Sequence, residues 1–393
     1  MKTVLVAGCD GYIGNALTQR LLNYGYEVIG IDSFLRRDWI QIDMKSKSAT
    51  PIMTMDAKMM RFKDMGKFHF YKMNIAYENA FDNLKNVFEM HKPDIIVNLA
   101  HIPSAPYSQI SRRHASKTLE NNILGTNNML WLMKDIVPES HYITIGTTGE
   151  YDHYSNIDIE EGYIKINHKG RESVEMIYPR RPGSIYHTSK TSSTYLIDFL
   201  CRTWQLKCTD VQQSVVFGAY TDEIDVSKIY SRLDSDEAGG TVINRFIVQS
   251  LLGISLTIYG EGKHQRGFIS LNDSVQALMI AVINEPEPGH VQVWNQLSEW
   301  HSMNEIAGMV LEVAENRGLE VDTQHIPSPR TEYTGNHYYK YSTEKLASFG
   351  YKPTITIMEE VDYVFDVLSQ TNEFYDLQNV VMPKIKWRED ECN

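Results

Sequence analysis

The first 32 residues of the chain constrain its fold more than any other segment. The apolar run 3–8 leads into a Gly-x-x-Gly-x-x-Gly turn, then a helical pattern, then a second apolar run at 27–31. This order predicts a strand, a tight turn, a helix and a parallel strand, with glycines that let the backbone approach a pyrophosphate closely. The N-terminus of the helix would offer free N–H groups and a positive dipole end to phosphates. The residues predicted to surround a dinucleotide there are Gly8, Gly11, Tyr12, Ile13 and Gly14.

Asp32 ends the second predicted strand, about 20 residues after the glycine turn. A carboxylate at that place accepts hydrogen bonds from the adenosine ribose of NAD and repels the 2′-phosphate of NADP. Arg36 and Arg37 follow closely and could hold a phosphate instead. The sequence therefore favours NAD as the cofactor, with NADP as the alternative.

Strand and helix patterns continue to alternate through the first half of the chain, with apolar strand-like runs at 68–73, 94–100, 141–145 and 209–217. This order predicts an α/β fold: a Rossmann-type doubly wound parallel sheet with a smaller mixed α/β C-terminal substrate lobe. Ligands collect beyond the carboxyl ends of strands in such sheets. The further positions assigned to the cofactor are Asn74, Ile75, Leu99, Ala100, His101, Asn122, Gln213 and Val216.

The pattern changes after the strand at 209–217, where acidic loops are expected at 222–237. We expect residues 1–217, with a return segment at about 266–290, to form the NAD-binding Rossmann domain. Residues 218–393 are expected to form the substrate-binding lobe, with segments of the two parts interleaved. The last ~15 residues are polar and aperiodic, which predicts a tail or an arm.

Composition and charge exclude several classes of function. The formal net charge of −12 argues against a general binder of nucleic acid or of anionic membranes. No apolar run approaches the ~20 residues of a membrane span, and the first strand begins too early to leave room for a signal peptide. Four cysteines without metal-ligand spacing favour a reducing, cytoplasmic location and predict no metal site.

Tyr186 and Lys190 lie one helical turn apart in a strongly helical stretch. Side chains at this spacing share a helix face, so an ammonium can lower the pKa of a phenol that is otherwise near 10. Both can face a bound nicotinamide ribose. The structural alternative is a tyrosine and a lysine on a helix surface, but the dinucleotide motif upstream favours a catalytic pair.

The motifs together resemble the extended short-chain dehydrogenase/reductases that act on nucleotide sugars. The shared features are the glycine turn, Asp32, Thr147 after the fifth strand, the Tyr186–Lys190 pair and a smaller lobe with scattered basic residues. The stretch 156–164 is similar to the UDP-sulfoquinovose synthase family in particular, since ordinary epimerases and dehydratases lack it. The resemblance covers nearly the whole chain, and it is also carried by 104–108, 146–151, 186–190, 257–260, 265–267 and 327–330.

The resemblance implies synthesis of UDP-sulfoquinovose from UDP-glucose and sulfite, with NAD kept bound and regenerated in each cycle. Tyr186 would take the proton of the glucose 4-hydroxyl while C4 gives hydride to NAD. Lys190 would lower the tyrosine pKa and hold the nicotinamide ribose, and Thr147 would orient O4. The 4-keto group would acidify C5, water would leave from C6, and sulfite would add there before hydride returns to C4.

The steps at C5 and C6 need an acid and a base. Related 4,6-dehydratases carry Asp-Glu directly after the threonine, whereas this chain has Thr148 and Gly149, with Glu150 one position later. This departure argues against a plain dehydratase and leaves Glu150 and His187 as candidates. Each also has a structural interpretation, Glu150 as a hydrogen-bonded loop carboxylate and His187 as a satisfied histidine.

The diphosphate of a nucleotide sugar would need local cations in this acidic chain. Arg266 and Arg330 are the predicted clamps, because guanidinium groups bind phosphates in bidentate fashion. Arg245 and Gln265 are secondary candidates, and a surface ion pair is the structural alternative for each arginine. Tyr259 is expected to line the uracil. The predicted substrate contacts are Ser104, Tyr107, Thr147, Gln213, Arg245, Tyr259, Gln265, Arg266 and Arg330.

Sulfite needs a small anion pocket beside C6. The resemblance places an arginine of the plant-type enzymes where this chain has Pro103. His101 could supply the missing positive charge, or hydroxyls and backbone amides could hold the anion. Asn74 also stands where an aspartate is usual near adenine, with little loss expected.

Two other functions remain open. A UDP-glucose 4-epimerase or 4,6-dehydratase uses the same three residues with bound NAD, and only the synthase depends on sulfite. A non-catalytic NAD-sensing module would not need Thr147, Tyr186 and Lys190 together. The apolar positions 195, 196, 199 and 200 exceed what one sheet face needs, which favours a homodimer or higher homo-oligomer, although a buried helix explains them equally.

Overall fold

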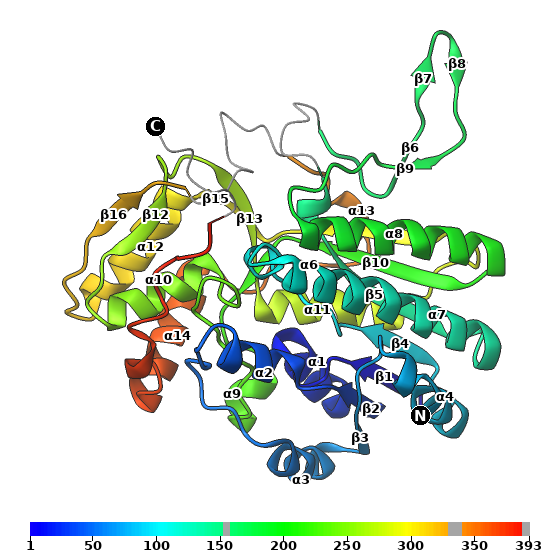
Figure 1. Cartoon of the computed structure of the whole chain (residues 1–393), viewed down its shortest axis with the longest axis horizontal. Coiled ribbons are helices and arrows are strands. Elements are labelled where there is room, and N and C mark those ends of the chain that lie inside the picture. Colours follow the sequence, from blue (N-terminus) through cyan, green and yellow to red (C-terminus); the bar gives the residue numbers. More distant parts are fainter. Residues whose placement is uncertain (152–157, 329–339, 387–393) are drawn as a thin grey trace.

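The computed structural model describes residues 1–151, 158–328 and 340–386 of the chain. At its centre lies a seven-stranded sheet in the order β14-β10-β5-β4-β1-β2-β3, with every neighbouring pair parallel (Figure 1). The predicted Rossmann-type sheet is therefore confirmed. Its strands are β1 (Thr3–Ala7), β2 (Glu27–Asp32), β3 (Phe68–Lys72), β4 (Ile95–Asn98), β5 (His141–Thr147), β10 (Lys207–Gln213) and β14 (Val291–Gln296).

Helices cover both faces of the sheet because successive strand residues point to opposite sides. Val4 and Val6 of β1 belong to the core that the first helix layer covers, whereas Leu5 and Ala7 belong to the core under the second layer. The first layer contains α1 (Tyr12–Asn23), α3 (Met55–Met65) and α11 (Leu271–Ile283). The second contains α4 (Phe81–His91), α7 (Gly125–Ile136) and α8 (Ile185–Trp204).

A π-helical turn interrupts the helix that precedes β5. The chain runs through α6 (Arg112–Leu119), the π-turn η2 (Glu120–Leu124) and α7 without leaving helical structure. π-turns inside helices are frequent at functional sites. Here the turn carries Asn121 and Asn122, and both hydrogen-bond to the loop that follows β4.

The strand predicted at 209–217 is two strands. β10 ends at Gln213, and β11 (Val215–Phe217) leaves the central sheet to pair with β13 (Gln265–Ser270). Ser214 lies at the break, and its backbone N–H donates to the carbonyl of Gln296 at 3.1 Å. A continuous apolar run could not show this change of sheet. The break directs the chain from the Rossmann part into the second lobe.

The second lobe has its own hydrophobic core, built mainly by three helices: α10 (Val242–Leu251), α12 (Met303–Asn316) and α14 (Ile357–Thr371). They pack against β12 (Leu256–Tyr259), which pairs with β16 (Thr323–Ile326), and against β13, which also pairs with β15 (Glu299–Ser302). The shorter elements of the chain are α2 (Leu35–Ile42), α5 (Ala105–Ser108), α9 (Asp222–Ser227), α13 (Glu344–Ser348), η1 (Glu78–Ala80), η3 (Thr148–Glu150) and η4 (Tyr375–Leu377).

The acidic segment 222–237 is not the loop that its composition predicts. It begins with α9, and Asp234, Asp236 and Glu237 are buried. The end of the described chain packs against it, since the backbone N–H groups of Lys384 and Ile385 both donate to Glu237. The expectation of a free tail therefore fails for residues up to 386, because buried carboxylates need such donors.

Residues 163–177 form an arm that projects from the body of the molecule (Figure 1). It consists of β6 (Tyr163–Ile164) paired with β9 (Met176–Ile177), and of β7 (Asn167–His168) paired with β8 (Arg171–Glu172). Among the described residues, none of the helices is both long and apolar enough to span a membrane.

Candidate active site

A cavity of about 440 Å³ lies between the carboxyl ends of the sheet strands and the second lobe. The glycine turn, Asp32, Thr147, Tyr186 and Lys190 line it on the side of the sheet. Arg245, Tyr259 and Arg266 line it on the side of the lobe. The structure thus brings together, at one place, most of the residues that the motifs predicted. Other predicted residues on its wall are Asn74, Ile75, Leu99, Ala100, His101, Ser104, His187, Gln213 and Val216.

The glycine turn admits only glycine at two of its positions. Gly8 has φ +86°, and a Cβ there would lie 2.8 Å from the backbone carbon of Leu99. A Cβ on Gly14 would lie 2.0 Å from the carbonyl oxygen of Gly8. The turn therefore brings α1 close to β1, and its backbone faces the cavity without side chains in between. This cradle, with the first N–H groups of α1 above it, fits the pyrophosphate of a dinucleotide.

Asp32 is held at the cavity by two backbone donors, the N–H of Asp10 at 2.9 Å and the N–H of Phe34 at 2.7 Å. Burial and the nearby Asp10 carboxylate raise the pKa of Asp32 to about 6. Arg37 pairs with Asp10 at 2.5 Å and Arg36 pairs with Asp234 at 2.9 Å. Because both arginines already have carboxylate partners, this arrangement fits the ribose of NAD better than a 2′-phosphate.

Tyr186 stands in the first turn of α8, which begins after the N-cap residue Ser184. Burial and the Glu150 carboxylate raise the pKa of Tyr186, and a hydrogen bond with Thr147 lowers it. Burial lowers the pKa of Lys190 to about 8. The expected lowering of the tyrosine pKa by the lysine is therefore not seen: desolvation of the phenol is the largest effect, and the group that lowers the pKa is Thr147.

His101 is the nearest partner of that lysine, with its Nδ1 3.2 Å from Lys190 Nζ. Burial and Lys190 hold the pKa of His101 well below its ordinary value, so the ring is neutral. The idea that His101 supplies a positive charge for sulfite is therefore wrong for this environment. Since Nδ1 accepts from the lysine, Nε2 carries the proton, and it has no hydrogen-bond partner among the described residues.

Glu150 lies behind the cavity wall and is fully buried. One carboxylate oxygen accepts from the backbone N–H of Thr147 at 3.2 Å, and the other accepts from the Thr194 hydroxyl at 3.0 Å. It caps the short helix η3 together with the Thr147 side chain. Burial raises the pKa of Glu150 against the opposing charge of Arg180. This geometry matches the structural interpretation of Glu150 better than contact with a substrate.

His187 occupies the space that a side chain at position 149 would need. A Cβ on Gly149 would lie 2.3 Å from His187 Nε2. The other ring nitrogen, Nδ1, is 3.0 Å from the Ser184 hydroxyl, and the ring centroid is 5.0 Å from that of Tyr186. The histidine therefore stands on the cavity wall beside Tyr186.

Three predicted contacts lie away from the cavity wall. Tyr107 is buried, donates to Asp43 at 2.9 Å and packs edge-on against Trp39. Asn122 bridges the loop after β4 and the Ser189 hydroxyl. Gln265 is exposed and accepts from the Trp300 indole at 2.8 Å.

The lobe side of the cavity carries two arginines. Arg245 donates to the carbonyl of Thr257 at 3.1 Å, and its guanidinium lies 5.4 Å from the centroid of the Tyr259 ring. Arg266 lies on β13, opposite His301 of β15. The predicted clamp Arg330 falls outside the described residues.

The motifs did not reveal the buried charges behind the catalytic pair. Asp210 on β10 shares the Thr194 hydroxyl with Glu150, at 3.1 Å, and burial raises the pKa of Asp210. Arg180 has its side chain buried and lies 3.8 Å from Glu150. The only signal for Asp210 was an acidic residue inside an otherwise strand-like run, and Arg180 gave no signal at all.

The model of the NAD dependent epimerase/dehydratase family matches residues 4–295 of the chain. A chloroplastic UDP-sulfoquinovose synthase from Spinacia oleracea is 36% identical over 98% of this chain and 79% of the spinach protein. A UDP-sulfoquinovose synthase from Sulfolobus acidocaldarius is 36% identical over 99% of this chain and 98% of the archaeal protein.

Solved structures with the same fold include a UDP-glucose 4-epimerase from Thermotoga maritima with UDP-glucose. It has a TM-score of 0.69 and 18% identity, and the match covers 94% of this chain and 99% of that one. A dTDP-glucose 4,6-dehydratase from Bacillus anthracis in complex with NAD also has a TM-score of 0.69, with 17% identity and coverage of 96% and 99%.

Proposed function

The chain belongs to the NAD dependent epimerase/dehydratase family, and from that premise we propose that it converts UDP-glucose and sulfite to UDP-sulfoquinovose with NAD as its cofactor. The observation that carries the proposal is the 36% identity to two UDP-sulfoquinovose synthases over almost the whole chain. In this proposal residues 1–217 with the return segment hold NAD, and the lobe 218–393 holds the nucleotide sugar.

The lobe side of the cavity supports binding of a diphosphate. Arg245 and Arg266 line it in a chain whose formal net charge is −12, so they form a local positive region in an acidic molecule. Guanidinium groups bind phosphate oxygens through paired N–H donors. Tyr259 stands beside Arg245 and is assigned to the uracil.

The sheet side supports chemistry at C4 of the sugar. When bound, NAD accepts hydride from C4 and returns it at the end of the cycle. Tyr186 takes the proton of the 4-hydroxyl, and the Thr147 hydroxyl, which hydrogen-bonds to Tyr186, orients O4. Lys190 stabilises the phenolate form of Tyr186 that accepts this proton. The product of this half is a 4-keto sugar with an acidic C5 proton.

We assign the acid and base work at C5 and C6 to His187 rather than Glu150. His187 lines the cavity next to Tyr186, whereas Glu150 is enclosed behind Thr147. The C5–H bond breaks, the C6–O bond breaks, and the departing hydroxyl leaves as water after it receives a proton. Sulfite then forms the C6–S bond with its sulfur lone pair, C5 regains a proton, and hydride returns to C4. The net change is one sulfite consumed and one water released.

Sulfite would meet hydrogen-bond donors rather than a fixed cation. His101 is neutral, and Pro103 carries no charge where the plant-type enzymes have arginine. The Nε2–H of His101 and the hydroxyl of Ser104 lie on residues that line the cavity after β4. These donors fit the arrangement in which hydrogen-bond donors, and not a positively charged histidine, hold the sulfite.

The decisive experiment is mass spectrometry of the products from UDP-glucose with and without isotopically labelled sulfite. We expect an anionic UDP-sugar that contains the label and forms only when sulfite is present. UDP-galactose in the absence of sulfite would overturn the proposal in favour of an epimerase, and a stable 4-keto-6-deoxy product would favour a dehydratase. No turnover of any substrate, with NAD still bound, would favour the sensing module.

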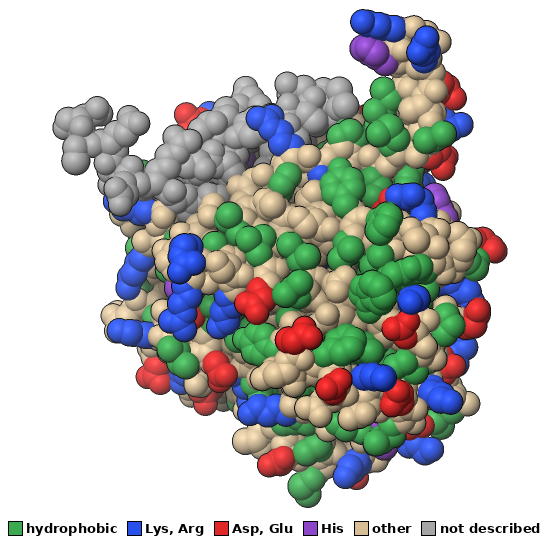
Figure 2. Space-filling view, turned by 45° about the vertical axis from the view of Figure 1, so that its right-hand side comes forward, with side chains coloured by type: hydrophobic (Ala, Val, Ile, Leu, Met, Phe, Trp, Pro, Cys, Tyr) green, Lys and Arg blue, Asp and Glu red, His purple; other side chains and the backbone are tan. Residues whose placement is uncertain are grey.

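We also propose that the protein forms a homodimer through α7 and α8. Trp131 on α7 is 41% exposed, and Tyr195 and Phe199 on α8 are 47% and 54% exposed. Figure 2 turns this side of the molecule forward and shows hydrophobic side chains spread across it. Light scattering should give the mass of two chains, and Phe199→Asp should give the mass of one.

A cytoplasmic location is part of the same proposal. Cys9, Cys201 and Cys208 are all buried free thiols. Such cysteines are typical of a reducing compartment. Fractionation of cells that express the chain would test the location, and recovery in an oxidising compartment would contradict it.

A further inference from the structure

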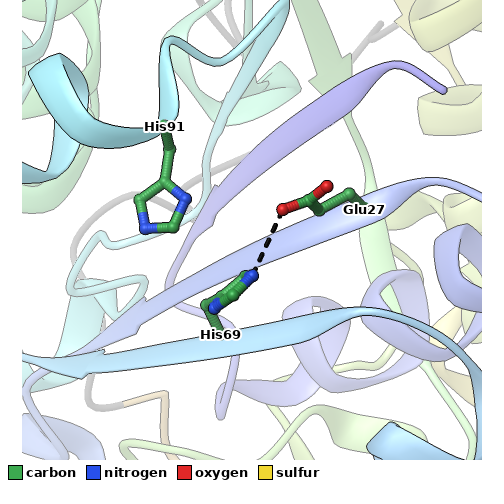
Figure 3. Close-up of side chains that lie close together, drawn as sticks. All are labelled: Glu27, His69 and His91. Carbon is green, nitrogen blue, oxygen red and sulfur yellow. Dashed lines mark hydrogen bonds and ion pairs between the residues drawn. The ribbon is translucent and has the colours of Figure 1, made fainter.

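A cluster of two histidines and one glutamate lies on the sheet, away from the cavity. Glu27 is the first residue of β2, His69 is the second residue of β3, and His91 is the last residue of α4. One potential ligand atom from each residue lies within 4.8 Å of the other two. His69 Nε2 is 3.2 Å from a carboxylate oxygen of Glu27, and Figure 3 shows a ring nitrogen of His91 turned towards both.

The fold, and not the local sequence, assembles this cluster. β2 and β3 are adjacent parallel strands, and their register pairs Val28 with Phe68. Residues two apart on a strand share a face, so His69 and Tyr71 both point towards the layer that contains α4. The helix ends at His91 over these two side chains, and its ring centroid is 4.8 Å from that of His69.

We propose that Glu27, His69 and His91 bind a divalent transition metal ion of the Zn²⁺ class. Two imidazoles and one carboxylate are a ligand set that zinc accepts, with water completing a tetrahedron. Zn–N bonds of about 2.0–2.1 Å place the ligand atoms of a tetrahedral site roughly 3.3 Å apart. His69 Nε2 and the Glu27 carboxylate oxygen already have that spacing, at 3.2 Å, and the ligand atom of His91 lies within 4.8 Å of both. Binding therefore requires the His91 ring to move closer to the other two ligands.

The surroundings of His91 support a role as a ligand. The Tyr71 hydroxyl is 2.7 Å from His91 Nε2, which leaves Nδ1 for the metal. Histidine ligands usually use their second ring nitrogen for a hydrogen bond that orients the ring.

One cation competes for the glutamate. Lys67 Nζ lies 3.7 Å from the second carboxylate oxygen of Glu27, and this lysine is 67% exposed. It uses the oxygen that does not face His69, so both contacts can coexist. An exposed pair of this kind contributes little energy and is screened by salt. It therefore lowers the metal affinity only slightly.

The metal would stabilise the sheet and would not take part in the chemistry. Glu27 begins β2, whereas Asp32 ends it at the cavity, so the two lie roughly 16 Å apart at about 3.3 Å per residue. β3 is the edge strand of the sheet, and the chain continues from it to Asn74 and Ile75 on the cavity wall. Binding would tie this edge to β2 and α4.

The test uses full-length protein without a histidine tag, stripped with a chelator and titrated with Zn²⁺ by calorimetry. We expect one Zn²⁺ per chain and a thermal unfolding midpoint that rises with Zn²⁺ concentration. His69→Ala and His91→Ala should each remove both effects. Tyr71→Phe should keep the stoichiometry and weaken binding by about 10–100-fold. His168→Ala, on the exposed arm, is the control and should behave as the unaltered protein.

His69 is 45% exposed, so its replacement should not impair folding, and sulfite-dependent turnover of His69→Ala should be unchanged. A second readout is the absorption spectrum with Co²⁺, in which tetrahedral d–d bands should appear and should be lost in the same variants. The proposal is overturned if His69→Ala retains the stoichiometry and the midpoint rise. It is equally overturned if the stripped protein takes up no Zn²⁺ at micromolar concentration.

Discussion

Two networks of buried charge lie along the same edge of the sheet, and they differ in how closely their ions are paired. The Asp10 network contains Asp10, Asp32, Arg37 and Lys58 at the ends of β1 and β2. The Glu150 network contains Glu150 after β5, Asp210 in the middle of β10, Arg180 in the loop before α8, and Lys190 in α8. Each network therefore has two carboxylates and two cationic side chains.

The Asp10 network is closely paired. Arg37 and Lys58 contact Asp10 at 2.5 and 2.9 Å. Although burial opposes them, these two cations lower the pKa of Asp10. Within the described part of the chain, Asp32 forms hydrogen bonds with backbone N–H groups and no ion pair, which fits its proposed role at the ribose. The network thus fixes the cofactor end of the cavity.

The Glu150 network is loosely paired. Among the residues that the structure describes, its ions come no closer than 3.8 Å, between Arg180 and Glu150, and the two carboxylates share one threonine hydroxyl. Burial raises the pKa of both Glu150 and Asp210 and lowers that of Lys190 to about 8. Buried ionisable groups without close partners of opposite charge change their protonation state more readily. This property suits the side of the cavity where we propose that protons are transferred.

The largest effect is expected where the Glu150 network meets the substrate. Tyr186→Phe removes the group that we propose exchanges a proton with the sugar 4-hydroxyl, and we expect kcat to fall by about 10²–10⁴-fold. NAD binding should remain, as measured by calorimetry. Tyr195→Phe, on the exposed face of the same helix, is the control. Normal turnover by Tyr186→Phe would exclude the phenol as the base.

The second-largest effect should show that the Asp10 network contributes more to the free energy of unfolding than the Glu150 network does. Lys58 is 1% exposed and donates to Asp10 and Asn15. Lys58→Met leaves a buried carboxylate with one cation fewer, which should lower the free energy of unfolding by about 3–5 kcal/mol. Urea denaturation measures this, with Lys228→Met as the control in an exposed pair. If Asp210→Asn proved more damaging than Lys58→Met, the ranking of the two networks would be reversed.

A smaller effect is expected at the outer face of Asp32. Asp32→Ala removes the acceptor assigned to the adenosine ribose, and we expect the affinity for NAD to fall by about 10–100-fold. The affinity for NADP should fall less, because the repulsion of its 2′-phosphate is lost as well. Calorimetric titration with both cofactors decides the matter. A stronger preference for NAD in this variant would contradict the assigned role.

The smallest effect concerns pH. Glu150 has a raised pKa, so the folded state holds its proton to a higher pH than the unfolded chain does. The free energy of unfolding should therefore fall as pH rises above the ordinary glutamate value of 4.5. Glu150→Gln should remove this slope. Asp10 has the opposite sign, since its stabilisation is lost as pH falls below 3.8.

Thermal midpoints between pH 4 and 8 measure the contribution of Glu150, and midpoints below pH 3.8 measure that of Asp10. An unchanged slope in Glu150→Gln would show that another group titrates in that range. The control is Glu312→Gln, because Glu312 is exposed on α12. Asp210→Gln would be a poor control, since it adds a methylene group to a buried site.

Short-range patterns in the sequence were enough to predict the sheet and the motifs that line the cavity. The glycine turn, Asp32 and the Tyr186–Lys190 pair each depend on spacing along one or two elements. The same is true of the strongly helical stretch that contains this pair, which is α8 in the structure. The patterns failed at Ser214. There the apolar sequence run is continuous, but the backbone leaves the central sheet and β11 pairs with β13.

Local spacing alone therefore determined the order of strands and helices and the place of the nucleotide turn. Only the tertiary structure decided that Arg36 and Arg37 are already paired, that His101 is neutral, that Glu150 is enclosed and that Glu27, His69 and His91 meet. The physical reason is that burial and charge pairing arise from contacts between segments far apart in the chain. These contacts determine the protonation state of each side chain and which groups it can contact. The spacing of residues within a single segment does not reveal them.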